Sequence, residues 1–324
     1  MGAPDVSIGI VSWNVADHLR RCLEALPAAL GGLAADIVVV DNASLDHSAE
    51  VAEAAGARVI RSPENLGYAR AMNLALRSAA TPIVIALNPD TVPSPGSLRR
   101  LVEVLQGRPD AAVVGPLLRR PDGQIEHSVH RFPSVTLLAV ANLVPQWLPP
   151  RVVRDRLWLA GAVRPARTCA VDWVVGAVHV LRRDALPADG PYRERWFMYA
   201  EDVDLCWRLR QRGWRTVFVG DAEVVHVGGA SARQVADRTG EPPWTAATYD
   251  WYRLAFGRRR TRLFATLNLL GELRLLLARL GRAVIDRSAR TRAREQLRAG
   301  LALARRHLAV AAGRDERGSL LDPS

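Results

Sequence analysis

The sequence predicts an α/β fold, a Rossmann-like, mostly parallel sheet flanked by helices, and three observations lead to this class. Nearly half of the 324 residues are hydrophobic (49%), so the chain can bury a large core. Short apolar runs with the character of buried strands recur at residues 6–12, 36–42, 58–60 and 83–87. Segments with helical periodicity lie between them, at residues 17–30, 46–55 and 67–79. Strand–helix alternation of this kind builds a parallel sheet with right-handed crossovers.

The ends of the first two predicted strands carry different signals. The first runs into Ser12-Trp13-Asn14 without the G-x-G-x-x-G pattern of dinucleotide-binding folds. The second ends in Asp41-Asn42, where a carboxylate can accept hydrogen bonds from a ribose or a pyrimidine N–H. We expect Asp41 to contact a ligand, whereas Asp46 is expected only to cap the helix that follows.

The strand at Ile83–Leu87 is followed by Asn88-Pro89-Asp90. Pro lacks an N–H and ends the strand, so Asp90 is expected at its carboxyl end, the edge where open α/β sheets bind ligands. A carboxylate there can hold a divalent cation against a diphosphate. Read alone, the same three residues also favour a simple turn.

Two helix starts follow from local signals. Asn65-Leu66-Gly67 opens the helix at 67–79, where Gly67 would let the backbone approach a ligand. Arg70, in its first turn, could meet a base or a phosphate, although an exposed helix arginine is the commoner role. Ser94-Pro95 is expected to start a helix that reaches residue 106, with Ser as cap and Pro at the first position.

The second half places further polar residues near predicted strand and helix ends. Residues 133–168 form an irregular insert rich in Pro, Leu, Trp and Arg, and residues 172–182 regain strand character. A helix is expected over 201–212, stopped by Gly213, with Glu201 and Asp202 in its first turn. Two strands are expected at 214–219 and 223–227, and His226 lies near the end of the second.

The net charge of +11 belongs to the last part of the chain. Residues 251–324 hold 17 Arg and 6 acidic residues, whereas residues 1–250 are neutral with 27 of each, and the chain contains no Lys. Leucines at helical spacing among these arginines, from Leu263 to Val284, predict a basic amphipathic helical extension. It could bind an anionic membrane surface, or pack on the body or on a second copy in a homo-oligomer. The neutral body argues against nucleic-acid binding as the main function.

Other features bear on location. Three scattered cysteines fit a reduced cytoplasmic protein, and neither a signal peptide nor a spanning run of 18 apolar residues is recognised. We therefore expect a cytoplasmic protein attached peripherally at the inner face of the cell membrane.

Five motifs together resemble family 2 inverting glycosyltransferases with the GT-A fold, especially bacterial rhamnosyltransferases of cell-envelope assembly. The resemblance runs through roughly residues 5–230. It is carried by Val40-Asp41-Asn42-x-Ser44-x-Asp46, Asn65-Leu66-Gly67-Tyr68-Ala69, Asn88-Pro89-Asp90, Phe197-Met198-Tyr199-x-Glu201-Asp202-Val203-Asp204 and His226.

The resemblance implies roles for these residues. Asp41 would hold the base or ribose, Asp90 would be the last carboxylate of a metal-binding D-x-D motif whose first position is Asn88 here, and His226 would be a third contact for Mg²⁺ or Mn²⁺. Asp202 would be the general base, with Glu201 capping or orienting. Further candidate contacts to the nucleotide sugar are Asn42, Asn65, Gly67 and Arg70. Weaker candidate contacts to the acceptor are Trp196, Phe197 and Asp204. Asp204 could also face solvent, and the two aromatic residues could belong to the core.

The function implied is inverting transfer of a sugar, rhamnose from dTDP-rhamnose, to a hydroxyl of a cell-envelope glycan or polyprenyl-linked acceptor. Alternatives are another family 2 hexosyl- or galactofuranosyltransferase using a UDP- or GDP-sugar, or a non-catalytic nucleotide-sugar-binding module. A nucleotidyltransferase would be expected to carry a Gly- and Arg-rich loop after the first strand, where Ser12-Trp13-Asn14-Val15 stands instead. The expected organisation is a catalytic domain over 1–250, with residues 133–168 a possible acceptor region, and the helical tail over 251–324.

Overall fold

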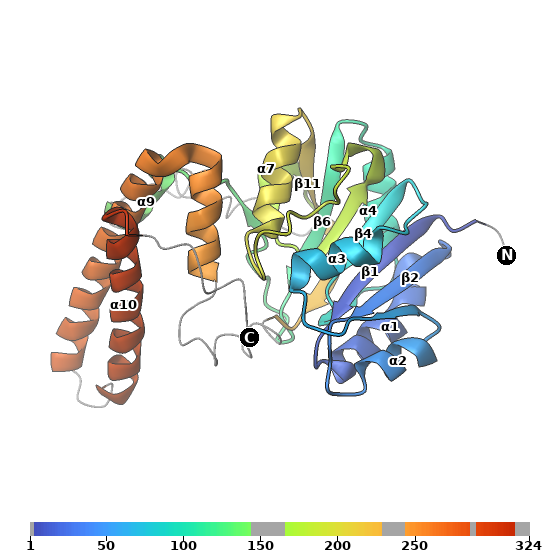
Figure 1. The fold of residues 1–324 in the computed structure, drawn as a ribbon, viewed down its shortest axis with the longest axis horizontal. Helices are drawn as coiled ribbons and strands as arrows, with labels where there is room; N and C mark the ends of the chain where they lie inside the picture. Colours follow the sequence, from blue (N-terminus) through green and yellow to red (C-terminus); the bar gives the residue numbers. More distant parts are fainter. Residues whose placement is uncertain (1–2, 144–165, 229–243, 286–289, 315–324) are drawn as a thin grey trace. The chain divides into compact units, whose positions relative to one another are not determined.

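A computed structural model describes residues 3–143, 166–228, 244–285 and 290–314 of the chain. The described residues fall into two compact units, one drawn from residues 1–132 and 158–235 and the other from residues 133–157 and 236–324 (Figure 1). The second unit thus includes most of the insert, and its C-terminal segment begins ahead of the change in charge near residue 251. Most of the predicted insert, residues 144–165, lies outside the described residues.

The first half of the first unit is the parallel sheet that the sequence predicts. Its strands are β1 (Val6–Ser12), β2 (Ala35–Asp41), β3 (Arg58–Arg61) and β4 (Ile83–Leu87). They lie in the order β3-β2-β1-β4, all parallel. The crossover helices are α1 (Ala16–Leu30), α2 (Ser48–Ala54) and α3 (Tyr68–Leu76). Because the strands are parallel, their carboxyl ends meet at one edge of the sheet.

The second half extends the same sheet with mixed strand directions. It contains β5 (Thr91–Pro93), β6 (Ala111–Arg119), β8 (Thr168–Val171), β10 (Val178–Arg182) and β11 (Arg215–His226). The order continues from β4 as β10-β6-β11-β5, and β8 also pairs with β11. Strand β10 is antiparallel to both neighbours, β6 and β11 are parallel to each other, and β5 is antiparallel to β11. The two strands expected at 214–219 and 223–227 are therefore one strand, with a register shift between Val219 and Glu223.

Helices cover both faces of this sheet. On one face Ile8 and Ile10 of β1 join a core cluster with Leu26 of α1 and Leu101 of α4 (Ser97–Gln106). On the other face α3 packs so closely on β1 that a Cβ on Gly9 would lie 2.8 Å from the Leu76 side chain. Burying aliphatic side chains on both faces is what stabilises a sheet of this kind.

Two predicted helix starts are wrong. Helix α4 begins at Ser97 after Gly96, which has φ 73°, rather than at Ser94-Pro95. The reason is tertiary, because β5 pairs with β11 up to Pro93, and the Gly96 N–H then donates to the Ala28 carbonyl. Helix α2 begins at Ser48, later than expected, and Asp46 accepts from the backbone N–H groups of both Ser48 and Ala16. Asp46 thus joins the starts of two helices instead of occupying a cap position.

Four smaller elements complete the described part of the first unit. Strands β7 (Val129–His130) and β9 (Trp173–Val174) form a separate two-stranded sheet. Helix α7 (Glu201–Gln211) follows β10 and the short 3₁₀ helix at Arg183–Ala185. Gly213, with φ 89°, lies just past its end, as the sequence predicts.

The second unit is helical. It contains α5 (Val135–Leu143), α9 (Trp244–Ile285), which is kinked at Gly257 (φ 80°), and α10 (Arg290–Ala311). Tyr252 stacks on Phe264 across the kink with ring centroids 4.2 Å apart, and the Tyr249 hydroxyl lies 2.7 Å from His307 Nδ1. The leucines of α9 divide between two faces: Leu267 is buried, whereas Leu263, Leu270, Leu273, Leu277 and Leu280 are exposed. None of the described helices combines the length and the apolar character needed to cross a bilayer.

Candidate active site

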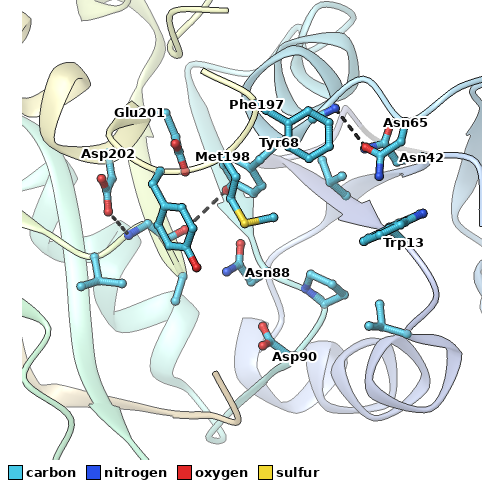
Figure 2. A pocket seen from close by; sticks show the side chains of 18 of the residues that line it. Trp13, Asn42, Asn65, Tyr68, Asn88, Asp90, Phe197, Met198, Glu201 and Asp202 are labelled. Carbon is cyan, nitrogen blue, oxygen red and sulfur yellow. Dashed lines mark hydrogen bonds between the residues drawn. The ribbon is translucent and has the colours of Figure 1, made fainter. Parts of the chain in front are cut away.

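A pocket of about 220 Å³ opens at the carboxyl edge of the parallel strands in the first unit (Figure 2). Segments distant in the sequence supply its walls. Its polar lining comes from Asn42, Asn65, Asn88, Asp90, Glu201, Asp202 and His226. Aromatic and apolar walls come from Val11, Trp13, Val15, Tyr68, Pro89, Val175, Ala177, Phe197, Met198 and Tyr199, with Gly67 and Gly176 between them. The acidic pair and the Asn-Pro-Asp segment therefore face one cavity.

The Asn88-Pro89-Asp90 segment is a tight corner after β4. The Asn88 carbonyl accepts from the Thr91 N–H at 3.3 Å and from the Thr91 hydroxyl at 2.6 Å. Asp90 is 8% exposed, and the Asn88 side-chain Oδ1 is buried with no hydrogen-bond partner among the described residues. A buried amide oxygen without a partner is costly unless a ligand satisfies it, so it marks a binding position.

His226 reaches this corner through strand pairing. Thr91 of β5 is the register partner of His226 at the end of β11, which sets the imidazole beside Asp90. Its Nε2 lies 3.5 Å from Asp90 Oδ1 and its Nδ1 lies 2.9 Å from Glu126 Oε2. Burial alone would lower the pKa of His226, but the two carboxylates outweigh it and raise that pKa to about 9. Burial opposes ionisation of Asp90, yet the neighbouring imidazole holds the pKa of Asp90 below its usual value.

The segment at residues 175–177 joins the two halves of the pocket. The Ala177 carbonyl accepts from the Asn88 N–H at 2.9 Å, and the Gly176 N–H donates to Asp202 Oδ2 at 3.3 Å. The Tyr68 hydroxyl donates to the Gly176 carbonyl at 3.4 Å. A Cβ on Gly176 would lie 3.3 Å from the Asp202 Cβ, so the glycine allows this close approach. Asp202 is thereby held to the same backbone that supports Asn88.

The acidic pair is presented by a strained turn. Tyr199 and Ala200, with φ 72° and 67°, are both in the left-handed region directly before α7. Non-glycine residues in this region cost about 1–3 kcal/mol each and cluster at functional sites. The turn aims Glu201 and Asp202 from the first turn of α7 into the pocket (Figure 2).

The two acids differ in their hydrogen bonds. Asp202 accepts from the N–H groups of Val203, at 2.8 Å, and Gly176, whereas Glu201 Oε2 is buried without a partner among the described residues. Burial raises the pKa of Asp202, and burial together with the Asp202 charge raises the pKa of Glu201 to about 8. Because the Asp202 charge disfavours ionisation of Glu201, Asp202 ionises before Glu201, and Glu201 keeps its proton at neutral pH.

The other wall of the pocket is held by an asparagine pair. Asn42 Nδ2 donates to Asn65 Oδ1 at 2.7 Å, and Asn42 Oδ1 accepts from the Leu66 N–H at 2.8 Å. Gly67, with φ 75° and ψ 170°, brings the chain against Phe197, whose carbonyl accepts from the Tyr68 N–H at 2.8 Å. Gly67 therefore lines the pocket and leaves room for Phe197. The hydrogen bond from Tyr68 connects the start of α3 to the segment that leads into Glu201 and Asp202.

Four predicted site residues lie outside the lining. Asp41 ends β2 and is 7% exposed, with Oδ1 accepting from the Ser44 N–H at 3.3 Å. Arg70 points to solvent, 4.0 Å from Glu64. Trp196 is buried, which agrees with its alternative role in the core. Asp204 does not face solvent, because it is 2% exposed and accepts from Arg208 at 2.7 Å.

Several lining residues are not among the site residues that the sequence predicts. Trp13 follows β1 and lines the pocket beside Asn42, where a planar ring could face a nucleobase. Gly176 and Met198 also line it, and Glu126 contacts it only through His226. An aromatic residue directly after a strand was available as a signal for Trp13, whereas Glu126 is brought to His226 only by the fold.

The residues at the corner fit a divalent cation. Asp90 Oδ1 and His226 Nε2 stand side by side, and the partnerless Asn88 Oδ1 lines the same cavity. No three His, Cys, Asp or Glu side chains within the described ranges form a complete ligand set by themselves. A site that offers one carboxylate and few other protein ligands suits Mg²⁺ or Mn²⁺, which take their remaining ligands from diphosphate oxygens and water.

A Rossmann-like sheet with an acidic pair facing this corner defines the GT-A class of glycosyltransferases. Comparison with solved structures agrees on the fold: a mannosyltransferase from Pyrobaculum calidifontis, solved with GDP-mannose and Mn²⁺, superposes with a TM-score of 0.55. The match covers 97% of this chain and 89% of that one at 16% identity.

Sequence comparisons give the family. The glycosyl transferase family 2 model matches residues 7–170. An N-acetylglucosaminyl-diphospho-decaprenol L-rhamnosyltransferase of Mycobacterium tuberculosis is 34% identical over 230 residues, covering 67% of this chain and 74% of that protein. A pre-mycofactocin glycosyltransferase of the same organism is 29% identical over 225 residues, covering 68% and 42%. The chain belongs to glycosyl transferase family 2 and is of the rhamnosyltransferase-like type.

Proposed function

We propose that this glycosyltransferase is an inverting, divalent-cation-dependent enzyme that moves rhamnose from dTDP-rhamnose to a hydroxyl of a polyprenyl-diphosphate-linked glycan. One observation carries the proposal: Asp202, a carboxylate that ionises before its neighbour, lines the same cavity as Asp90 and His226. A base and a diphosphate-binding corner across one cavity are what an inverting transfer requires.

The reaction assigned to this geometry is a single displacement. The acceptor oxygen forms a bond to the anomeric carbon, and the bond from that carbon to the diphosphate breaks with its electron pair. Asp202 takes the hydroxyl proton and later releases it to solvent. Bound Mg²⁺ or Mn²⁺ at Asn88, Asp90 and His226 would neutralise charge on the leaving diphosphate. Asp41, buried behind the pocket, and Asn42, Asn65 and Trp13 at its wall are assigned to the nucleoside.

The donor and acceptor follow from the relatives and from the chemistry of the lining. The 34% identical relative is named as a rhamnosyltransferase acting on a decaprenyl-diphosphate sugar. Val175, Ala177 and Met198 give the cavity an apolar wall, which suits the methyl group of a 6-deoxy sugar better than a hydroxymethyl group. A panel of dTDP-, UDP- and GDP-sugars, scored by product formation and by protection against melting, tests this choice. A preference for a UDP- or GDP-hexose would reassign the donor.

The base assignment is tested with Asp202→Asn. Transfer should fall by about 10²–10⁴-fold, because general base catalysis contributes on that order. Protection against melting by dTDP should persist, since Asp202 is assigned to the hydroxyl and not to the nucleotide. Asp17→Asn is the matched control, because Asp17 lies on α1 with its side chain 81% exposed. A folded Asp202→Asn variant with transfer near the wild-type rate would show that Asp202 is not the base, and NMR of the product anomer tests inversion directly.

For a lipid-linked acceptor we further propose peripheral attachment of the second unit to the anionic inner face of the cell membrane. The exposed leucines Leu263, Leu270, Leu273, Leu277 and Leu280 follow one another at intervals of three, four or seven residues on α9, so they share one face. Arg259, Arg262 and Arg274 are exposed beside them, and the net charge of this part of the chain opposes self-association. Leucines inserted among lipids with arginines at headgroup level are typical of interfacial helices.

Vesicle co-sedimentation tests the attachment. The wild-type chain should bind phosphatidylglycerol vesicles more than phosphatidylcholine vesicles, and less as salt rises. Leu270→Gln with Leu277→Gln should reduce binding, whereas Leu45→Gln, at a leucine 96% exposed in the first unit, should not. If the double variant binds vesicles as the wild type does, the leucine face of α9 is not the membrane-binding surface. If the wild type is a dimer in sedimentation velocity and the double variant is a monomer, this face binds a second copy of the chain instead.

A further inference from the structure

Glu126 lies outside the pocket lining but contacts His226, which lines the pocket. Its Oε2 lies 2.9 Å from His226 Nδ1, one hundred residues away in the sequence. The opposite ring nitrogen, Nε2, lies 3.5 Å from Asp90 Oδ1 at the cavity. The imidazole therefore stands between a carboxylate in the cavity and a carboxylate behind it.

The chemistry of the three groups fixes the direction of the ring. An ionised carboxylate only accepts hydrogen bonds, so the nitrogen facing Glu126 carries a proton. In the cation-free protein the raised pKa of His226 leaves Nε2 protonated as well, so a bound cation would replace that proton and meet the Nε2 lone pair on the cavity side. Histidines that bind metal ions usually donate their other N–H to a carboxylate or carbonyl, which sets the ring orientation and the tautomer.

The backbone around Glu126 holds it in place for this contact. Its N–H donates to the Leu118 carbonyl at 2.9 Å, at the end of β6, the neighbour of β11 in the sheet. Arg119, the residue after Leu118, donates two hydrogen bonds of 2.8 Å to Glu223, which lies three residues before His226 on β11. Glu126, just after the bridge between Arg119 and Ile125, is thus held against the end of β6, the strand that pairs with the β11 strand of His226, and its side chain is 24% exposed.

We infer that Glu126 is a positioning residue that fixes the His226 ring with Nε2 turned to the cavity and so sets the pocket's affinity for a divalent cation. This inference rests on the proposed cation-dependent function. It adds to the corner formed by Asn88, Asp90 and His226 a residue that touches neither the donor nor the cation. Loss of such a partner is expected to weaken metal binding by about 10–100-fold.

The test is Mn²⁺ titration of the full chain by calorimetry, with dTDP present. Glu126→Ala should weaken Mn²⁺ binding by about 10–100-fold, and Glu126→Gln, whose amide oxygen can still accept from Nδ1, should weaken it less. Asp122→Asn removes one negative charge from the exposed turn between Arg119 and Ile125, four residues before Glu126, and should bind Mn²⁺ as the wild type does. Imidazole ¹⁵N shifts, recorded without metal at a pH above about 9 where the ring is neutral, should show the Nδ1–H tautomer lost in Glu126→Ala and kept in Glu126→Gln.

Each outcome decides the inference. Mn²⁺ affinity of Glu126→Ala equal to the wild type overturns it, as does an equal loss in Asp122→Asn, which would make the effect one of charge alone. If Glu126→Ala does not fold, Glu126→Gln decides through its affinity and ¹⁵N shifts. If the wild-type chain transfers sugar without binding Mn²⁺ or Mg²⁺, the role of Glu126 and the cation dependence are overturned, but the transferase activity stands. If it binds Mn²⁺ but transfers no sugar, the proposed transferase function is contradicted and the role of Glu126 in cation binding stands.

Discussion

Replacing Gly67 by Ala should destabilise the first unit and displace both Glu201 and Asp202 from their positions in the pocket. Gly67 has φ 75° and ψ 170°, a region that residues with a Cβ enter at a cost of about 1–3 kcal/mol. A Cβ there would also lie 2.5 Å from the Phe197 carbonyl oxygen, where backbone must move. Overpacking of this kind costs about 1–3 kcal/mol. The movement would also disturb the 2.8 Å hydrogen bond from the Tyr68 N–H to the same carbonyl.

Together these effects predict a loss of about 2–6 kcal/mol in the free energy of unfolding, a large part of the usual stability of a domain. The measurement is urea unfolding, with donor KM and kcat determined on the folded fraction. The control is Gly56→Ala, which shares a positive φ of 79° but has nothing within 4 Å of the added Cβ. It should cost only about 1–2 kcal/mol and leave both kinetic constants unchanged. Equal losses in the two variants would refute the role assigned to the Phe197 contact.

Three further predictions concern the same unit. Glu201→Gln should be as active as the wild type near pH 7, where Glu201 is protonated. Its stability relative to the wild type should rise between pH 4.5 and about 8, because the unfolded wild-type chain releases the Glu201 proton in that range while the folded protein keeps it, which favours unfolding of the wild type. Unfolding at pH 5, 7 and 9 checks this, and a pH-independent difference would contradict it. Ala200→Gly should stabilise the fold by about 1 kcal/mol, because glycine adopts φ 67° without strain; a loss of stability in thermal melts would argue against strain in this turn. Arg182→Met should cost about 2–3 kcal/mol, because the guanidinium donates to the carbonyls of Leu105, Arg108 and Ala111 within 3.0 Å; chemical unfolding with a cost below 1 kcal/mol would show that water replaces those bonds.

The parts predicted well from the sequence are those specified by neighbouring residues. Strand β4 and the Asn-Pro-Asp corner follow from a run of branched apolar side chains stopped by Pro, and the structure places Asp90 there as expected. The first turn of α7 with Glu201 and Asp202 was also predicted, because Gly213 and the leucine spacing define that helix locally.

The parts that failed depend on contacts between distant segments. The start of α4 was misplaced because pairing of β5 with β11 keeps Thr91–Pro93 extended, and nothing near Ser94 announces that partner. Asp204 was expected at the surface, yet Arg208 and the turn before α7 bury it as an ion pair. Glu126 and the left-handed pair Tyr199-Ala200 are visible only in three dimensions, since neither residue type marks such a role.

The short pairing of β5 with β11 has a consequence for how this enzyme can diversify. Three residue pairs, ending with His226 opposite Thr91, set the spacing between the histidine and the aspartate that precedes Thr91. The loop positions among the intervening 130 or so residues, apart from the strands, helices and pocket residues that they connect, can therefore lengthen, shorten or change in character without altering that spacing. Recognition of new acceptors can evolve in those positions while the donor end of the reaction stays as it is.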